Sequence, residues 1–558
     1  MMGRTKNRML RLLVAVALLM GINLLAGLFN IRFDLTEDNR YTLSEEAIAT
    51  VSDFEKPVVV DVLLDGDLPP EFIRLKTETR QILEEFASEN GNIKFTFVDP
   101  LKDSDQPDAT IAELQGLGLI PAQVTVEDEA KVSQELVFPW AMVNYGDKTV
   151  KVPLLKNKLG ATSEERVNNS VQQLEYAFAD AFSKINIQQK KQVAVIKGNG
   201  ELEDIYLADF LTSIRDYYNI GAITLDSVAV NPQKTLDQLK GYDLALIAKP
   251  TEPFSDGEKY VLDQYIVAGG KSMWLIDPVN MELDSLFNEQ GTAMALPRDL
   301  QLTDFLFKYG IRLNTDLVND MYFTQIVLAT GEGNASQYNP VPWLYHPMVF
   351  SRNDHPINKN IEAVRFQFAS SIDTLSNENE KTVLLQSSPL SRLDGIPRQL
   401  GLDLINNPPK KENFDNGNQA LAVLIEGEFT SAFTNRVKPL ELENPLEKGK
   451  ANQMLVISDG DVIKNQVRNG RPLELGYDKS TNNYYGNKEF LINSLNYLLD
   501  DGGLINIRNK QVAVPFLDEQ KIAAQKTGWQ ILNLGLPVVL VAIFGLCFTY
   551  WRRRKYGT

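Results

Sequence analysis

The sequence predicts a mixed α/β fold in which two α/β domains lie between two membrane-spanning helices. Residues 12–29 and 529–551 are apolar runs without acidic or basic residues, and each is long enough to cross a bilayer. Between them, short runs rich in Val and Ile alternate with stretches whose apolar residues recur every three or four positions, as in strands and helices. The polar residues 186–191 separate these elements into two groups.

The first apolar run follows a basic cluster of Arg4, Lys6, Arg8 and Arg11. Its 18 residues would form about 27 Å of helix, close to the thickness of a bilayer core. The alternative is a cleaved signal peptide, whose apolar core usually has about 7–15 residues. The run is longer and no clear small-x-small cleavage site precedes Phe29, so we expect an uncleaved anchor.

Trp529 and Trp551 lie at the two ends of the second apolar run. Aromatic side chains of this kind favour the headgroup zone, so their positions support a membrane span. Three arginines and Lys555 follow it. Basic residues therefore flank both runs on their outer sides, which places the tails 1–11 and 552–558 in the cytoplasm and the bulk between the spans on the other side of the membrane. A buried core helix is a weaker alternative, because over 20 residues carry no charge.

The composition excludes several classes of function. The net charge is −17 and no basic stripe is present, so we expect no nucleic-acid partner. Cys547 is the only cysteine and lies inside the second span, which excludes an internal disulfide and a thiolate nucleophile outside the membrane. His346 and His355 are the only histidines, so few metal or Ser-His-Asp sites are possible.

The first group of elements, within residues 30–187, predicts a thioredoxin-like domain from its β-α-β and α-β-β order. The redox chemistry of that fold is excluded because no cysteine is present. Strands are expected at residues 58–64, 93–98, 123–127, 135–145 and 148–153, and helices at 70–89, 109–117 and 163–185.

The second group, within residues 188–505, predicts a parallel sheet with covering helices, because residues 242–278 have the pattern of a β-α-β crossover. Residues 280–450 are expected to be irregular, with added strands at 363–368, 382–386 and 420–426. Residues 506–528 are expected to be a linker to the second span. The other expected strands are 192–196, 223–225, 244–248, 271–276 and 453–458, and the helices are 204–218, 255–268 and 487–499.

Polar or small residues follow three strands of this sheet. They form the set Gly198, Asn199, Gly200, Asp277, Asp459 and Asp461. Open α/β sheets bind ligands at the carboxyl ends of their strands, so a small-molecule site is one hypothesis. The simpler interpretation is that Gly and Asp form turns after strands.

Two further motifs are not expected to bind cofactors or metals. Gly270, Lys271 and Ser272 imitate the end of a Walker A loop, but Tyr265 replaces its first glycine and a strand follows. The two histidines precede prolines at a spacing that fits no common zinc motif. We predict that their Pro- and Asn-rich segment is a loop, with Trp343 and Tyr345 as partner contacts.

Several phrases resemble one protein family as a set. They include FDLTEDNRYTLSEEA, KPVVVDVLLDGDLPPEF, ENGNIKFTFVDP, KQVAVIKGNGE, the crossover run and NKEFLINSLNYLLD. The chain is similar over essentially its whole length to auxiliary, non-ATPase components of ABC transporters, in particular to those associated with gliding motility. The resemblance implies a flavodoxin-like second domain of the class I glutamine amidotransferase type. Those enzymes use a nucleophilic cysteine that this domain lacks.

The resemblance also implies a setting in the bacterial inner membrane, with a periplasmic bulk. It implies an ABC permease-like membrane subunit and a cytoplasmic ATPase as partners, together with the lipid bilayer and possible cell-envelope partners. We therefore expect a non-enzymatic component without a cofactor. The alternatives are a ligand-binding protein that uses the strand-end loops, and an envelope hydrolase acting through Asp277 or Asp459.

Overall fold

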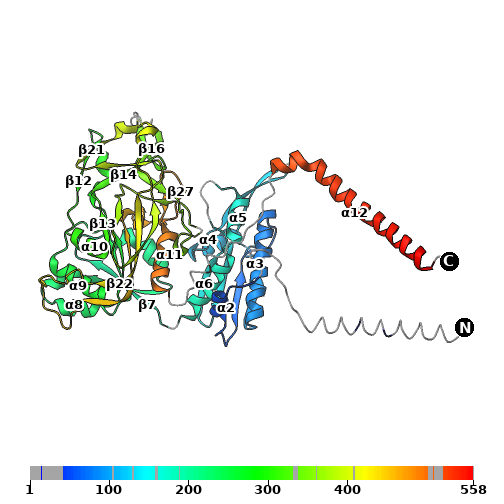
Figure 1. Ribbon diagram of the computed structural model, residues 1–558, viewed down its shortest axis with the longest axis horizontal. Helices are drawn as coiled ribbons and strands as arrows, with labels where there is room; N and C mark the ends of the chain where they lie inside the picture. The colour runs from blue at the N-terminus through cyan, green and yellow to red at the C-terminus, as the bar shows by residue number, and fades with distance from the viewer. Residues whose placement is uncertain are drawn as a thin grey trace. The chain divides into compact units, whose positions relative to one another are not determined.

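The computed structural model of the 558-residue chain contains two compact units, Met1–Gln511 and Val512–Thr558 (Figure 1). It describes residues 42–102, 106–128, 131–156, 161–187, 189–330, 337–359, 361–405, 409–500 and 519–556, together with positions 14, 20 and 507. Mixed α/β structure fills the first unit, as the sequence predicts.

The amino-terminal part of the first unit has a four-stranded sheet in the order β2-β1-β5-β6. β1 and β2 are parallel, whereas β5 is antiparallel to both β1 and β6. Their bounds are β1 Val58–Val62, β2 Ile93–Phe97, β5 Trp140–Tyr145 and β6 Lys148–Pro153, and a separate hairpin consists of β3 Ala122–Asp128 and β4 Lys131–Val137. The helices are α2 Glu45–Val51, α3 Pro70–Glu89, α4 Pro107–Gly116, α5 Ser163–Val171 and α6 Leu174–Asn186.

Two expected elements of this part are interrupted. The strand expected at residues 135–145 is divided into β4 and β5 around Pro139, which cannot donate a ladder hydrogen bond. The helix expected at 163–185 is divided into α5 and α6. The buried Ser170 hydroxyl donates to the Arg166 carbonyl at 2.7 Å, a back-bond that bends helices.

The second part of this unit is built on a large sheet in the order β13-β18-β22-β23-β10-β9-β7-β8, with β19 paired to β22. Five neighbouring strands, β8-β7-β9-β10-β23, are parallel, and β22 continues the sheet antiparallel to β23. The parallel strands are β7 Lys191–Lys197, β8 Tyr218–Thr224, β9 Leu244–Ala248, β10 Lys271–Leu275 and β23 Lys448–Ile457; the others are β13 Ile311–Leu313, β18 Ile372–Thr374, β19 Glu380–Gln386 and β22 Ala420–Thr430.

The local sequence explains why the strands and helices of this part form where they do. Every residue of β9 is buried, as expected for a parallel strand covered on both faces. The helix α9 begins with a capping box, in which Ser255 and Glu258 each bond to the other's backbone N–H. The helices of this part are α7 Asp204–Ile214, α8 Pro232–Leu239, α9 Asp256–Val267, α10 Thr303–Tyr309 and α11 Asn487–Leu499.

The region 280–450 is more ordered than we predicted. It carries small sheets, several of whose strands gather away from α8 and α9 in Figure 1. The first part of the expected loop, with His346, is the strand β16, which pairs with β15 on one side and with β17 on the other. His355 lies beyond this strand, just before the short helix Pro356–Asn358. Prolines at 340, 342 and 347 obscured the strand pattern in the sequence. The bounds are β11 Val279–Asn280, β12 Thr292–Pro297, β14 Asp316–Asp320, β15 Phe323–Thr330, β16 Gln337–Val349, β17 Val364–Arg365, β20 Ser391–Gly395 and β21 Arg398–Gly401.

The second unit contains the helix α12, Glu519–Tyr556. Within it, Gln525–Lys555 is long and apolar enough to cross a membrane, with a mean hydropathy of 2.5, and it contains the predicted span 529–551. It is the one such helix among the described residues. The end of the expected linker, from Glu519 onward, is helical. Nearly all of the predicted first span, residues 12–29, lies outside the described residues.

Candidate functional site

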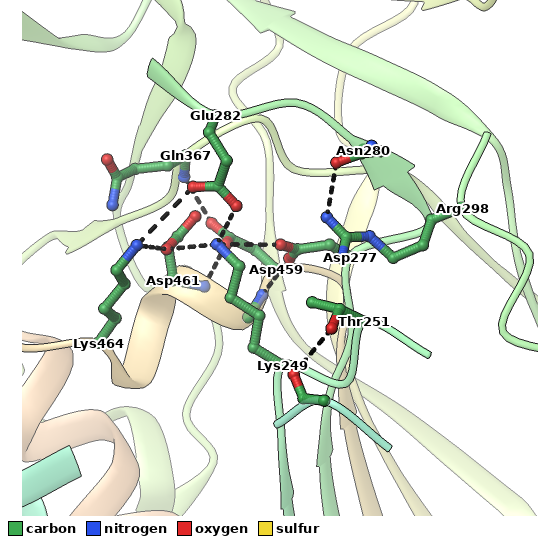
Figure 2. A network of polar contacts seen from close by, with 12 residues as sticks. Lys249, Thr251, Asp277, Asn280, Glu282, Arg298, Gln367, Asp459, Asp461 and Lys464 are labelled. Atoms are coloured by element: carbon green, nitrogen blue, oxygen red, sulfur yellow. Dashed lines mark hydrogen bonds and ion pairs between the residues drawn. The ribbon is translucent and has the colours of Figure 1, made fainter. Parts of the chain in front are cut away.

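Four parallel strands, β7, β9, β10 and β23, end at one edge of the large sheet. The segments that follow β9, β10 and β23 bring charged side chains into a single network with a buried centre, and Figure 2 shows its contacts. We call this set the strand-end network; its members are Lys249, Asp277, Glu282, Asp459, Asp461 and Lys464. It unites three of the aspartates that the sequence singled out, from positions almost two hundred residues apart.

Lys249 lies at the centre of the strand-end network. Its Nζ is 2.6 Å from Asp461 Oδ1, 2.8 Å from Glu282 Oε1 and 3.2 Å from Asp277 Oδ2, and only 3% of its side chain is exposed. Burial disfavours the ammonium, but the charges of the three carboxylates outweigh this effect and raise the pKa of Lys249. The lysine is therefore a permanently charged group inside the protein.

The backbone conformation of Lys249 and the close packing of Gly460 position the lysine among its carboxylate partners. Lys249 has a left-handed conformation (φ 54°), which costs a non-glycine residue about 1–3 kcal/mol. A Cβ at position 460 would overlap the Lys249 side chain, so only glycine allows η7 (Gly460–Ile463) to pack there. The Gly460 N–H donates to Asp277 Oδ1, which joins the ends of β10 and β23.

The pKa values of the neighbouring aspartates Asp459 and Asp461 are shifted in opposite directions. Burial raises the pKa of Asp459 well above its ordinary value, and the nearby Asp461 and Asp277 raise it further. Burial also opposes ionisation of Asp461, but Lys249 and Lys464 hold the pKa of that carboxyl below its ordinary value. Lys464 Nζ lies 3.3 Å from Asp461 Oδ1. Asp459 accepts the backbone N–H groups of Gln367 and Asp461.

The carboxylates of Asp277, Glu282 and Asp461 have the spacing of a metal site. One oxygen from each lies within 4.8 Å of the others. The Lys249 ammonium is within 3.2 Å of all three, however, and already supplies the positive charge that such a group of carboxylates requires. This arrangement favours an internal counter-ion over a bound cation.

The Gly198-Asn199-Gly200 turn after β7 packs against the segment after β9. The Asn199 carbonyl accepts the backbone N–H groups of Thr251 and Glu252, each at 2.9 Å, and the Asn199 side chain is buried. Gly198 and Gly200 both have positive φ, and a side chain at Gly200 would overlap the Thr251 hydroxyl. These contacts explain why glycines flank Asn199. They also use the Asn199 carbonyl for hydrogen bonds within the protein.

Trp343 and Tyr345, which we predicted as partner contacts, are placed by the structure inside a hydrophobic core instead of on an exposed surface. Both are less than 3% exposed, and they pack with Phe368. The Tyr345 hydroxyl donates to Asp394 Oδ2 at 2.7 Å, so its polar end is satisfied internally. His346, the residue after Tyr345, is fully buried, which lowers its pKa well below the ordinary value.

Sequence reasoning missed Lys249, Glu282 and Lys464. A signal for Lys249 was present, because a lysine directly after the wholly apolar strand LALIA must either leave the sheet edge or find carboxylates there. No comparable signal marks Glu282 or Lys464, which lie in polar segments.

Replacing Lys249 with methionine should strongly destabilise the protein. The Lys249→Met variant keeps the volume of the side chain but leaves buried carboxylates without their counter-ion, which typically costs about 3–5 kcal/mol. The check is chemical denaturation of the full chain in detergent micelles. Lys464→Met is the matched control; because Lys464 is 32% exposed, its loss should be below about 1 kcal/mol. Equal losses would contradict the central role of Lys249.

Asp459 and Asp461 should contribute to stability with opposite dependence on pH. Asp459 has a raised pKa in the folded state, so its contribution is present in acid and is lost as pH rises through that pKa. The stability of Asp459→Asn relative to wild type should therefore increase from about pH 4 to 7. Asp461 has a lowered pKa, so its contribution is fully present above about pH 4 and is lost as pH falls below that value. The difference in stability between Asp461→Asn and wild type should therefore stay constant from about pH 4 to 7 and shrink in more acidic solution. A constant difference between Asp459→Asn and wild type from about pH 4 to 7 would contradict the assignment.

The part of the chain that contains this site matches a known protein family. The family described as "ABC-type uncharacterized transport system" matches residues 190–494, which include the whole strand-end network. A domain of unknown function (DUF7088) matches residues 37–144. No curated protein matches the chain.

Among solved structures, one titled "mmIFT52 N-terminal domain" is 13% identical and covers 56% of this chain and 98% of its own, with a TM-score of 0.30. The family match extends over more than half of the 558 residues. The chain therefore belongs to the auxiliary ABC-transporter family described as an ABC-type uncharacterized transport system.

Proposed function

We propose that this protein is a non-enzymatic, integral subunit of an ABC-type assembly in the bacterial inner membrane. The observation that carries the proposal is the strand-end network. At the sheet edge where open α/β folds bind substrates, this protein places its own lysine among its own carboxylates. Asp277 and Asp459, the residues of the hydrolase alternative, are both buried within that network. Family membership and the helix α12 support a transporter setting.

The two α/β parts are proposed to be protein-binding modules derived from enzyme folds. Numbered along the chain, the five parallel strands have the spatial order 2-1-3-4-5, which supports a flavodoxin-like domain of the amidotransferase type. The β1–β2 pair and the antiparallel β5–β6 hairpin support a thioredoxin-like domain. Both enzyme types depend on cysteine chemistry, and Cys547 lies in α12.

The partners proposed are a permease-like membrane subunit, a cytoplasmic ATPase and proteins of the cell envelope. Gliding motility is the proposed process, on the strength of the sequence resemblance. The apolar stretches at both ends would give two contacts with the permease, and the α/β bulk would lie in the periplasm and transmit or receive motion driven by ATP. Binding of a substrate at Gly198, Asn199 and Gly200 is less favoured, because Asn199 is buried and its carbonyl is engaged by backbone N–H groups.

Purification tests the assembly. Mild solubilisation of membranes that contain the tagged full chain should recover a polytopic permease and an ATPase. As a matched control, residues 529–551 are replaced by an unrelated apolar span with the same basic flank. This variant should stay in the membrane but recover less permease, because helix–helix packing in a bilayer depends on specific side chains. Recovery of neither partner with the intact protein would contradict the proposal.

Cysteine labelling tests the two-pass topology. In a Cys547→Ser background, the exposed Ser376 is replaced with cysteine in one variant and Lys555 in another. A membrane-impermeant maleimide applied to cells with a permeabilised outer membrane should label Ser376→Cys alone, because the basic cluster retains residue 555 in the cytoplasm. Opening the inner membrane should then expose Lys555→Cys. Labelling of position 555 in unopened cells, or failure at position 376, would reject this orientation.

A further inference from the structure

A cavity lies at the opposite edge of the large sheet from the strand-end network. Its volume is about 440 Å³, within the usual range of about 300–1,000 Å³ for small-molecule sites. β7 and β8 line it with their first residues, Lys191 and Tyr218, so it faces the amino ends of the strands. Helices α2, α6 and α11 complete its wall, and all of these elements belong to the first compact unit.

The lining of this cavity is acidic. It contains the carboxylates of Glu46, Asp180 and Asp500 and one ammonium, that of Lys191. Lys191 Nζ donates to the Leu499 carbonyl at 2.8 Å, and thus serves the carboxyl end of α11. In the described part of the chain, no ion pair engages Glu46. Asp180 is paired with Lys184 at 2.9 Å, so Glu46 is the carboxylate that the cavity offers to a ligand.

Aromatic rings provide the apolar part of the wall. Tyr176, Tyr217 and Tyr218 all line the cavity, and the rings of Tyr217 and Tyr218 stack with centroids 5.8 Å apart. Tyr218 is held by a hydrogen bond from its hydroxyl to Asn496 Oδ1 at 3.0 Å. Flat, anchored rings beside carboxylates are the groups that bind organic cations in proteins.

One wall already holds an ammonium in this manner. Lys184 Nζ lies 3.8 Å from the centroid of the Tyr217 ring and 2.9 Å from Asp180 Oδ2, and the Tyr217 hydroxyl donates to the same oxygen at 3.0 Å. The Asp180 and Lys184 side chains are only about 15% exposed. The protein's own lysine thus shows that this environment accommodates a cation between a ring and a carboxylate.

We infer that this cavity binds a small organic cation, namely a primary amine attached to an aromatic or other flat apolar body. Glu46 supplies the carboxylate for the ammonium, and the tyrosine rings supply the surface for the apolar body. Glu46 is in the first turn of α2 and lines the cavity. This site is separate from the strand-end network and does not depend on the proposed transporter assembly.

Calorimetric titration of the full chain in detergent micelles tests the inference with three probes of similar shape. These are 2-phenylethylamine, a cation; 2-phenylethanol, which is neutral; and phenylacetate, an anion. The amine should bind saturably, and the other two should bind at least about tenfold more weakly, the effect of losing one charge-assisted hydrogen bond. Equal binding of all three, absence of saturable binding by the amine, or binding of the neutral sugar glucose in its place would overturn the proposal.

Two variants on the helix α2 test whether Glu46 is the carboxylate that binds the amine. Glu46→Gln should weaken amine binding about tenfold. Glu45→Gln, at the exposed neighbouring position in the same first turn, should leave binding unchanged, since Glu45 does not line the cavity. Unfolding temperatures of both variants close to that of the wild type would show that each is folded. Identical affinities for the two variants would reject Glu46 as the recognition residue and overturn the proposal.

Discussion

The ion pairs of Lys249 hold together the segments that follow three hydrogen-bonded strands of the large sheet. The lysine extends from the end of β9, and its carboxylate partners come from the end of β10, from residue 282 and from η7. The close packing of Gly460 and the left-handed backbone at Lys249 are both consequences of placing one ammonium among these groups. A buried charge requires every partner to be in position, so the network specifies how the sheet's edge closes.

Much of the secondary structure could be predicted because burial leaves a periodic pattern in the sequence. α3 and α11 begin and end where their apolar spacing predicts, and β9 is recognisable from its five apolar residues. The errors have local causes. β16 contains three prolines, so its residues suggested a loop, and the hydroxyl of Ser170 divides what the apolar spacing presents as one helix.

The candidate site could be predicted only in part. Parallel strands bring their carboxyl ends to one edge, and this rule correctly grouped Asp277 with Asp459 and Asp461. The rule cannot identify the counter-ion, because a pairing between positions 249 and 461 leaves no local pattern. The burial of Trp343 was missed for a similar reason. Its neighbours in the core, such as Phe368, come from other parts of the chain and leave no local pattern. Aromatic residues in a Pro-rich segment also resemble those of an exposed loop.

The position of β23 has a consequence for the order in which the protein assembles during synthesis. β10 pairs with β23, yet residues 276–447 separate the two strands in the chain. In a nascent chain that has formed β7, β8, β9 and β10, the edge of β10 that later pairs with β23 is still open, and Lys249 still lacks its partner in η7. Such edges invite pairing with other chains. The arrival of this distant strand is therefore the step that ends the exposure of the β10 edge to other chains.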